Sequence, residues 1–497
     1  MEFIKPKWKR GKSPPRWRTV DELIEQIQGY DPEADTDIVQ LAYEFAEHAH
    51  QGQTRANGDP YFSHSVATAA RLVDLKLDTT TIAAALLHDV VEDTDCTYDE
   101  LKKEFGKEIA NLVINVSKLS TIKYRGMERY LENIRRVFIA MAQDIRVVLI
   151  KLSDRINNLS TLSALRTDKQ IRIAKESLEV YAPIANRLGI GEFRGEIEDL
   201  SFRYVYPDEF HKTQSMFQEH YPHADKFLIK ASKTIEHELQ KAGIPFESVH
   251  GRKKHLYSLW KKLQLPEHNG DISKIHDLVA LRIIVSDVTA CYTVLGFIHK
   301  LWKPLKGRIK DYIAQPKPNG YQSIHTTVFG PHGRIIEIQI RDKEMHELAE
   351  YGVAAHWHYS EFIKGGKSKK PPQKIFSWMK ELTKWKKEFE HDKKYLETLK
   401  IDVFKNQIFV FTPDGDVVEL PEDATPVDFA YRVHTDLGNK CTAAKVNDKM
   451  APLDTPLKSG DVVEITKDKN RKGPNPDWLE FVKTNGAREH IRKAGRK

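Results

Sequence analysis

The sequence predicts a multidomain protein with three folded parts: an all-helical part, an α+β part and a small β-grasp part. The chain has 497 residues, a length that as a prior corresponds to about three domains. Hydrophobic residues make up 40% and charged residues 30%, which is typical of folded domains with a charged surface. Two changes of sequence pattern, near residues 244 and 401, separate the three parts.

Helical periodicity runs from about residue 20 to residue 240. Apolar residues recur every three or four positions in the segments 37–51, 130–143 and 231–243. This half of the chain is therefore predicted to be all-helical.

From residue 244 the pattern changes to short β-rich segments separated by turn residues. The segments are DLVALRIIVSD, YQSIHTTVFG and GRIIEIQIRD, with the helical GFIHKLWKPL among them. In RIIEIQI the alternation is strict, so Ile336, Ile338 and Ile340 face one way. Glu337 and Gln339 face the other way. These features predict an α+β domain.

The α+β part is followed by a Gly- and Lys-rich break at 365–373 and then by a charged helix at 378–400. We interpret this helix as a connector to a compact unit. Short strands around the turn Pro413-Asp414-Gly415, a helix near 426–431 and a closing strand after residue 460 predict a ubiquitin-like β-grasp fold. The last residues, from 468 on, are basic and begin another helix.

The composition argues against several protein classes. The chain begins without the apolar segment of a signal peptide, and no apolar run is long enough to span a bilayer. We therefore expect a cytoplasmic protein without membrane contact. Cys96, Cys291 and Cys441 lie far apart with no paired spacing, which favours core thiols over disulfides or a zinc site.

The formal net charge of +7 is concentrated in basic clusters at residues 5–18, 364–374 and 467–497. Such clusters suit a polyanion, nucleic acid above all, with Trp8 and Trp17 available to stack on bases. Solvated linkers explain any single cluster at least as well.

Three helical segments of the first part offer metal ligands beside apolar residues. His64 follows a Gly/Pro turn, His88 and Asp89 follow the run AAALL, and Asp154 follows the run VVLIKL. Two histidines and two carboxylates suit a divalent transition ion with an open water position. Each residue alone is more often structural, but the combination favours a metal site.

A second group of residues suits phosphate chemistry. Four cations follow a glycine turn: Arg252, Lys254, Lys261 and Lys262. They form either a clamp for a triphosphate or a plain solvated helix. Glu337 on the open face of its strand, together with Asp277 at the head of another, is suited to magnesium. Tyr321, beside a Pro/Gly-rich loop, is placed to stack on a base.

HQGQTRANGDPYFSH, LLHDVVEDT and KLSDRINNLSTL resemble the HD-hydrolase motifs of RelA/SpoT homologues. These are the bacterial stringent-response enzymes that make and destroy guanosine tetra- and pentaphosphate, (p)ppGpp. The resemblance implies an all-α HD-type domain whose Mn²⁺ ligands are His64, His88, Asp89 and Asp154. It also implies two catalytic acids and two nucleotide contacts, which are Glu92 and Asp93, and Arg55 and Asn158.

The sequence differs from the usual family residues at Asn57, Asp59 and Asn157, none of which is a metal ligand. Synthesis-only members resemble this domain but lose the His-Asp pair. The presence of His88-Asp89 therefore favours an active hydrolase.

The α+β part resembles the nucleotidyltransferase-like synthetase domain of the same family, which transfers pyrophosphate from ATP to the 3′-hydroxyl of GDP or GTP. The resemblance implies that Asp277 and Glu337 bind Mg²⁺ and that Glu337 also activates the 3′-hydroxyl. The residues implied to bind ATP phosphates are Arg252, Lys254 and Lys262. Those implied to bind GDP or GTP are Lys310, Lys317, Asn319, Tyr321, His325 and Gln339, with Tyr321 stacked on guanine. Residues 308–311 match the Arg-x-Lys-Asp motif of bifunctional members.

AYRVHTDLGNKC gives the β-grasp part a resemblance to the family's TGS domain. There the residue matching His434 contacts the 3′ end of uncharged tRNA on the ribosome; taken alone, this histidine is more often structural. The resemblance covers residues from about 20 to 480. The expected domains are a hydrolase with helical connector (1–200), a synthetase with linker helix (201–400), TGS (401–467) and the start of a basic helical region (468–497).

The resulting expectation is a bifunctional (p)ppGpp synthetase and hydrolase that binds ATP, GDP or GTP and (p)ppGpp, with ribosome and tRNA as partners. Two alternatives are a ribosome- and tRNA-binding regulator with vestigial catalytic sites and a synthetase with a silent hydrolase half. The first predicts damaged ligands, and the second conflicts with the intact His88-Asp89 pair and the Arg-x-Lys-Asp motif.

Overall fold

The computed structural model describes residues 18–120, 136–137, 140, 143–317, 321–352, 354, 407–413, 417–458, 460–468, 471 and 473–494. The chain divides into two compact units, Met1–Thr383 and Lys384–Lys497, and each is described by itself. The connector helix expected at 378–400, Trp8, Trp17 and the basic cluster at 364–374 lie outside the described residues.

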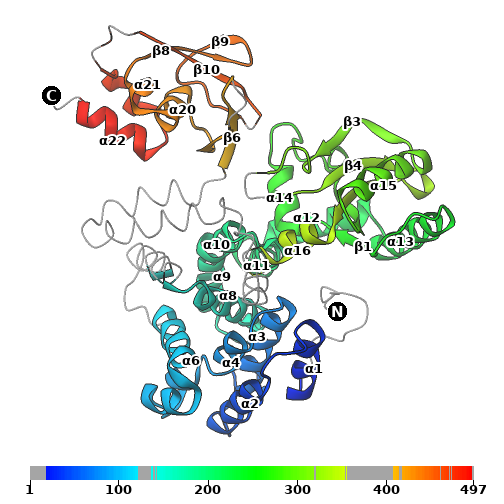
Figure 1. Ribbon diagram of the computed structural model, residues 1–497, viewed down its shortest axis with the longest axis vertical. Helices are drawn as coiled ribbons and strands as arrows, with labels where there is room; N and C mark the ends of the chain where they lie inside the picture. Colours follow the sequence, from blue (N-terminus) through cyan, green and yellow to red (C-terminus); the bar gives the residue numbers. More distant parts are fainter. Residues whose placement is uncertain are drawn as a thin grey trace. The chain divides into compact units, whose positions relative to one another are not determined.

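The first part of unit 1 is all-helical, as predicted (Figure 1). Its helices are α1 (Val20–Tyr30), α2 (Asp37–Ala49), α3 (Phe62–Asp74), α4 (Thr79–Leu86), α5 (Val90–Asp93), α6 (Tyr98–Ser120), α8 (Ile145–Ser160), α9 (Thr167–Glu176), α10 (Ala182–Arg187), α11 (Gly191–Val205), α12 (Pro207–His220) and α13 (Ala224–Lys241). Of the helical segment expected at 130–143, most residues are not described.

Helix α8 is the centre of this helical part. Its N-cap Asp144 accepts a hydrogen bond from the Arg146 backbone N–H, which satisfies one of the free donors at a helix start. The apolar run that follows is buried, and α8 contacts α3, α4, α6 and α11. A helix enclosed in this way can carry polar side chains into the interior only if they find partners there.

The α+β part of unit 1 is a five-stranded sheet in the order β1-β2-β5-β4-β3. The strands are β1 (Ser248–Lys253), β2 (Val279–Val285), β3 (Pro304–Asp311), β4 (Ile324–Phe329) and β5 (Ile335–Asp342), and the helices are α14 (Leu256–Leu263), α15 (Val288–Leu301) and α16 (Lys343–Tyr351). Strands β2 and β5 pair in parallel and the other pairs are antiparallel.

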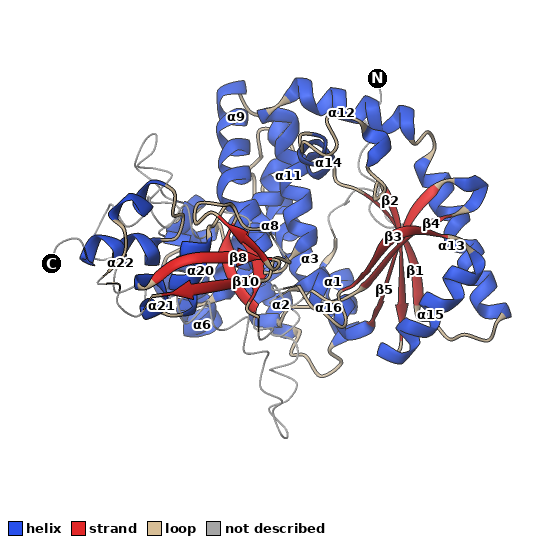
Figure 2. Ribbon diagram, turned by 90° about the horizontal axis from the view of Figure 1, so that it is seen from above, coloured by secondary structure: helices blue, strands red, loops and turns tan. Residues whose placement is uncertain are grey.

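The predicted alternation in β5 is confirmed. Ile336, Ile338 and Ile340 are fully buried, and α13 and α15 contact the strands of this sheet (Figure 2). The register places Arg282, Gln339, His325 and Lys310 in one row across β2, β5, β4 and β3. Paired residues on neighbouring strands share a face, so the face opposite the isoleucines is polar and mostly cationic.

Helix α16 joins the sheet to the helical part at close range. Gly352 follows α16 in a conformation with φ of 54°, and a Cβ there would lie 2.2 Å from the Leu188 carbonyl oxygen. Lys76, after α3, forms an ion pair of 3.2 Å with Glu347 of α16. Glycine at 352 therefore permits a backbone contact that any side chain would prevent.

Unit 2 has the predicted β-grasp elements. Its strands are β6 (Gln407–Phe411), β7 (Val417–Pro421), β8 (Cys441–Val446), β9 (Lys449–Ala451) and β10 (Val463–Lys467), and its helices are α20 (Pro426–Val433), α21 (Thr435–Asn439) and α22 (Asn485–Ala494). The sheets β10-β8-β9 and β6-β7 are joined by a parallel bridge between Phe411 and Val462. Asp414 and Gly415 of the expected turn are not described.

The segment after residue 467 packs on the β-grasp core. Trp478, Val482 and Ile491 are buried in one cluster with Val427 and Ala430 of α20. Helix α22 is basic in its last turn, as expected for this region. The residues on both sides of the expected boundary at 467 thus share one apolar core.

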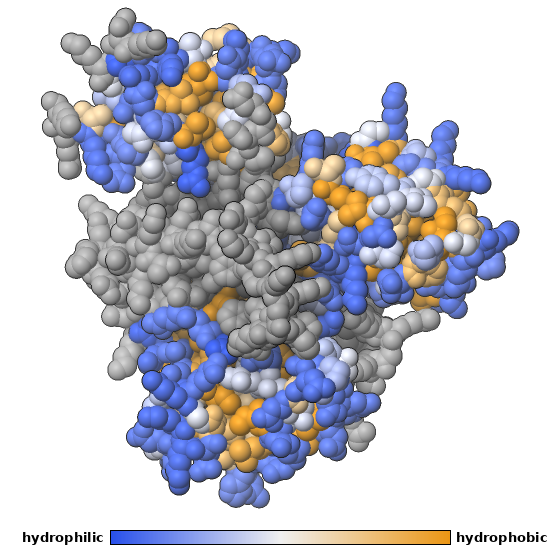
Figure 3. Space-filling model, in the orientation of Figure 1, coloured by the Kyte–Doolittle hydropathy of each residue, from blue (hydrophilic) through white to orange (hydrophobic). Residues whose placement is uncertain are grey.

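The surface agrees with the high charged fraction. On the face drawn in Figure 3, polar residues predominate and apolar residues form separate patches. Among the described residues no helix has both the length and the apolar character needed to cross a membrane. Cys291 and Cys441 are buried free thiols, and Cys96 is partly exposed and also free.

Asp428 of α20 fastens the C-terminal segment to unit 2. Its fully buried carboxylate accepts hydrogen bonds from the Thr484 backbone N–H at 2.7 Å, from the Lys483 backbone N–H, and from the Thr425 and Thr484 hydroxyls. Asp428→Ala should lower the stability of unit 2 by about 3 kcal/mol or more, because several buried donors lose their acceptor.

Hydrogen exchange followed by mass spectrometry measures this effect, with faster exchange expected in β8 and unchanged exchange in β2. The control is Glu464→Ala, which removes an exposed ion pair with Lys445 and should change exchange little. Equal exchange in the two variants would contradict the role of Asp428.

Candidate active sites

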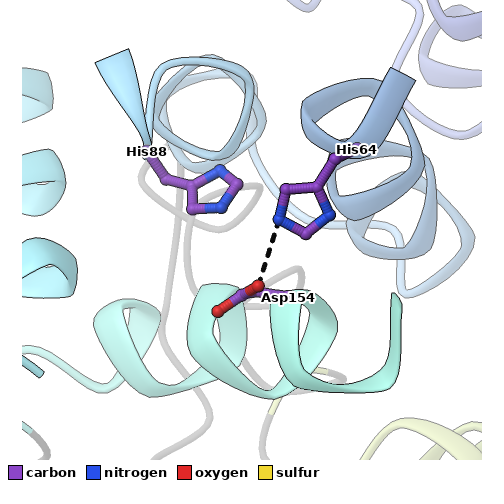
Figure 4. Close-up of side chains that lie close together, drawn as sticks. All are labelled: His64, His88 and Asp154. Atoms are coloured by element: carbon purple, nitrogen blue, oxygen red, sulfur yellow. Dashed lines mark ion pairs between the residues drawn. The ribbon is translucent and has the colours of Figure 1, made fainter. Parts of the chain in front are cut away.

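Three helical segments bring metal ligands together inside the helical part. His64 on α3, His88 after α4 and Asp154 on α8 place their ligand atoms within 4.8 Å of one another (Figure 4). All three are at most 3% exposed. The fourth predicted ligand, Asp89, lies beside them, with Oδ1 3.2 Å from His88 Nε2 and Oδ2 3.4 Å from His64 Nε2.

In both histidines the Nδ1 atom, which does not take part in the contacts with Asp89, has a hydrogen-bond partner. His88 Nδ1 lies 2.8 Å from the Ala85 carbonyl oxygen, and His64 Nδ1 lies 2.9 Å from Asn157 Oδ1. The remaining Nε2 of His88 is buried without a hydrogen bond of proper geometry. Such outer partners are typical of metal-ligating histidines, and the two imidazoles with two carboxylates fit a divalent transition ion.

The electrostatics favour a cation at this point. Burial by itself would lower the pKa of His88, but the charge of Asp89 and its contact with the ring, together with Asp154, raise the pKa to about 9. The pKa of Asp154 is held well below its usual range, against the effect of burial, by Lys151 and His64. Burial would also raise the pKa of Asp89, which is partly buried, but His88 and His64 lower it. Both carboxylates thus stay ionised, and positive charge must balance them.

Asp93 is drawn to the cluster by Tyr61, a residue that the sequence analysis missed. The Tyr61 hydroxyl lies 2.6 Å from Asp93 Oδ2 and 3.1 Å from Asp89 Oδ2. Glu92, one position earlier on α5, is exposed. Tyr61 lies only three residues before His64. This short spacing could have indicated that the two side chains lie near the same site.

Arg55 and Asn158 also lie at the cluster. Arg55 donates to Asn157 Oδ1 at 2.9 Å and to Asn158 Oδ1 at 2.6 Å. Asn158 Nδ2 donates in turn to Asp154 Oδ1. Asn157 therefore links Arg55 to His64, a contact that the sequence did not reveal. Asn57 and Asp59 bond to each other instead.

The polar face of the sheet carries the second site. Lys254 and Lys262 each place Nζ 2.7 Å from Asp277 Oδ2. The two ammonium groups hold the pKa of Asp277 far below its usual range, although burial opposes this. Asp277 Oδ1 is buried and has no hydrogen-bond partner, so one oxygen of an ionised carboxylate is available to a hard cation such as magnesium.

Glu337 lies on the same face, opposite Ala280 of β2, which in turn pairs with Arg252 of β1. Glu337 Oε1 accepts from Gln339 Nε2 at 2.7 Å and lies 3.3 Å from His325 Nδ1. Burial would raise the pKa of Glu337, but the contacts with His325 and Gln339 keep it below the usual value. The carboxylate is therefore ionised at neutral pH.

The predicted base-stacking residue, Tyr321, is connected to this carboxylate through His325. Tyr321 Oη is 2.8 Å from His325 Nε2, and the Lys317 ammonium lies over the Tyr312 and Tyr321 rings at 4.6 and 5.1 Å. Lys310 pairs with His325 in the β3–β4 register. Asn319, also expected here, is not described.

A buried ion cluster on this face was missed by the sequence analysis. Arg282 Nη1 lies 2.7 Å and Arg341 Nη2 lies 3.0 Å from Glu350 Oε1 on α16. One carboxylate thus faces two guanidinium groups, and Arg341 is fully buried. The sequence did show an arginine at a polar position of each strand, Arg282 in β2 and Arg341 in β5. Their partner Glu350 lies on α16, and only the fold brings it close.

His434 in unit 2 is exposed and caps α21, where its Nδ1 accepts from the Asp436 backbone N–H at 3.2 Å. This contact by itself explains the residue structurally.

Three protein families match successive segments of the chain: the HD domain at residues 42–191, the region found in RelA / SpoT proteins at 251–364, and the TGS domain at 408–467. The "GTP pyrophosphokinase" of Myxococcus xanthus is 46% identical over 94% of this chain and 61% of its own length. The "Bifunctional (p)ppGpp synthase/hydrolase SpoT" of Escherichia coli is 46% identical over 95% of this chain and 67% of its own.

Among solved structures, the small alarmone synthetase 1 of Bacillus subtilis bound to pppGpp matches 36% of this chain and 95% of its own. The identity is 24% and the TM-score 0.24. The chain spans 61% of the length of the Myxococcus xanthus relative and 67% of the length of the Escherichia coli relative.

Asp89→Ala should abolish tight binding of Mn²⁺ at the helical site. Removal of an outer partner of a metal ligand already weakens metal binding by about 10- to 100-fold, so loss of a ligand should exceed this. Titration with Mn²⁺, followed by electron paramagnetic resonance, measures the affinity. The control is Asp95→Ala, which removes an exposed carboxylate nearby; parent-like binding by the Asp89 variant would exclude this metal site.

Proposed function

The chain belongs to the RelA/SpoT family of (p)ppGpp synthases and hydrolases, and on this premise we propose that it has both activities. It transfers pyrophosphate from ATP to the 3′-hydroxyl of GDP or GTP, and it hydrolyses (p)ppGpp to GDP or GTP and pyrophosphate. The observation that carries the proposal is that one chain holds two separate ligand sets, the buried cluster of His64, His88 and Asp154 and the polar sheet face around Glu337.

The hydrolase site is the cluster on α3, α4 and α8. His64, His88, Asp89 and Asp154 would hold a divalent ion, and we assign Mn²⁺. Such an ion would lower the pKa of a bound water and so supply a nucleophile at neutral pH. Asp93, which accepts a hydrogen bond from Tyr61, is assigned together with Glu92 to accept the proton of that water. Arg55 and Asn158 are assigned to the nucleotide.

The synthetase site is the polar sheet face. Arg252, Lys254 and Lys262 neutralise the phosphates of ATP, which is the main requirement of phosphoryl transfer. Asp277 and Glu337 would hold Mg²⁺, and Glu337 also accepts the proton of the attacking 3′-hydroxyl.

The acceptor nucleotide binds beside Glu337. Tyr321 stacks on guanine, and its contact with His325 fixes the ring beside the carboxylate. The other residues assigned to the acceptor are Lys310, Lys317, Asn319, His325 and Gln339. The excess of positive charge at Arg282 and Arg341 over Glu350 suits an anionic substrate on the same face.

The alternatives are a synthetase with a silent hydrolase half and a regulator with vestigial sites. Against both, the metal-site histidines and carboxylates converge with their outer partners in place. Incubation of the chain with ATP and GDP under Mg²⁺, and separately with (p)ppGpp under Mn²⁺, tests the proposal. Product in both reactions supports it, and product in only one assigns a single activity.

The unit 2 β-grasp fold is assigned to uncharged tRNA on the ribosome, with His434 at the 3′ end. The His434 ring is exposed and therefore accessible to a partner. Basic residues in the last turn of α22 suit the negative charge of RNA. We place the enzyme in the cytoplasm, where these partners and the nucleotide substrates occur.

Glu337→Gln should lower the rate of synthesis by orders of magnitude. Glutamine keeps the shape of the side chain but has neither the charge for the metal nor the basicity for the 3′-hydroxyl. The fold should persist because Glu337 lies on the face opposite the buried isoleucines. Formation of (p)ppGpp from ATP and GDP is measured, with hydrolysis as an internal control. Glu344→Gln, at an exposed position of α16, is the matched control.

His434→Ala should reduce discrimination between tRNA with a free and with an aminoacylated 3′ end. The variant also loses the cap of α21, so His434→Asn, which keeps a capping acceptor, separates the two roles. Binding measured at increasing salt should weaken in every variant, because phosphate contacts release counterions. Parent-like discrimination in the Asn variant would reduce His434 to a helix cap.

A further inference from the structure

Lys151 is a buried lysine on α8, one helical turn before Asp154. It is 6% exposed, and its Nζ donates to Asp154 Oδ2 at 2.6 Å. A buried ammonium group carries a large desolvation penalty, which an apolar residue at this position would avoid. The lysine interrupts the apolar run of α8, so the fold retains a charge where packing alone does not require one.

The two oxygens of Asp154 have different surroundings. Oδ2 is engaged by Lys151, whereas Oδ1 lies 3.1 Å from His64 Nε2 and accepts from Asn158. The neighbouring Arg155, which is partly buried, makes other contacts: it lies over the Tyr181 ring at 4.3 Å and 3.6 Å from Glu176. Tilting the Asp154 carboxylate out of this orientation would break the contact with Lys151, so this contact fixes an orientation in which a single oxygen faces His64.

We propose that Lys151 is a positioning residue for the metal site: it holds Asp154 Oδ2 so that Oδ1 alone is presented to the divalent ion beside His64 and His88. A ligand fixed in advance binds a metal without first being ordered, which is why outer partners of metal ligands raise affinity. The inference rests on the proposed hydrolase function only in the choice of Mn²⁺.

The direction of the change in Mn²⁺ affinity on removal of Lys151 distinguishes a positioning role from a purely electrostatic one. An ammonium group draws charge from the carboxylate and repels the metal ion, so by charge alone the removal of Lys151 would tighten Mn²⁺ binding. By positioning, removal weakens it. Because these two effects are opposite, a weaker affinity identifies the positioning role.

The test compares Lys151→Met with the parent chain by titration with Mn²⁺ alone, followed by electron paramagnetic resonance. The isotherm of Asp89→Ala is subtracted, so that only the helical site is counted. We expect about 10- to 100-fold weaker binding, the range typical of lost outer partners. The Mn²⁺ concentration for half-maximal hydrolysis should rise by the same factor, and saturating Mn²⁺ should restore most of kcat.

Lys175→Met is the matched control, because Lys175 is an exposed lysine on α9 and its loss should leave both measurements unchanged. Synthesis by the same chain reports whether Lys151→Met is folded. If it is not folded, Lys151→Gln serves instead, with a shift in the same direction expected.

Parent-like or tighter Mn²⁺ binding in the folded variant would overturn the inference, as would a fall in kcat that saturating Mn²⁺ does not restore. Failure of the proposed function is distinguishable. In that case the parent would bind Mn²⁺ but not hydrolyse (p)ppGpp, and the comparison of affinities would still decide the role of Lys151.

Discussion

The burial of the ionised Asp154 carboxylate on α8 is the constraint on which the helical part depends. Asp154 is 3% exposed and ionised, and a single unpaired charge there would be incompatible with a stable fold. Lys151 pairs with its Oδ2, and His64 and Asn158 both contact its Oδ1. Around this point α3, α4 and α8 must meet at close range, so the geometry that stabilises the charge also assembles the ligands.

The sheet solves a similar problem by separating its two faces. Isoleucines on one side of β5 are buried in a single apolar cluster, so the other side is free to carry charge. That side has more cations than carboxylates, and two of its carboxylates each contact two cations: Asp277 contacts Lys254 and Lys262, and Glu350 contacts Arg282 and Arg341. This excess of positive charge suits the anionic nucleotides proposed as substrates.

The sequence predicted those features that repeat locally. Alternation in β5 predicted the two faces of the sheet, and apolar runs ending in His88-Asp89 and near Asp154 predicted a metal site, because each signal lies within a single element. Partners brought together by the fold were not predictable in this way. Tyr61 meets Asp93, Asn157 meets both His64 and Arg55, and Glu350 meets Arg282 only after distant segments pack. Periodicity contains no information about such pairs.

The contact at Gly352 has an evolutionary consequence. A methyl group there would meet the Leu188 carbonyl oxygen at 2.2 Å, and Gly189 opposite is also in the left-handed region with φ of 76°. Neither glycine can be replaced in small, individually tolerated steps. Even the smallest side chain, a methyl group, would push apart the two backbones that pack here. Substitution at either glycine is therefore expected to disturb this contact, whereas relatives with other residues at Glu347 or Lys76 should still have glycine at both positions.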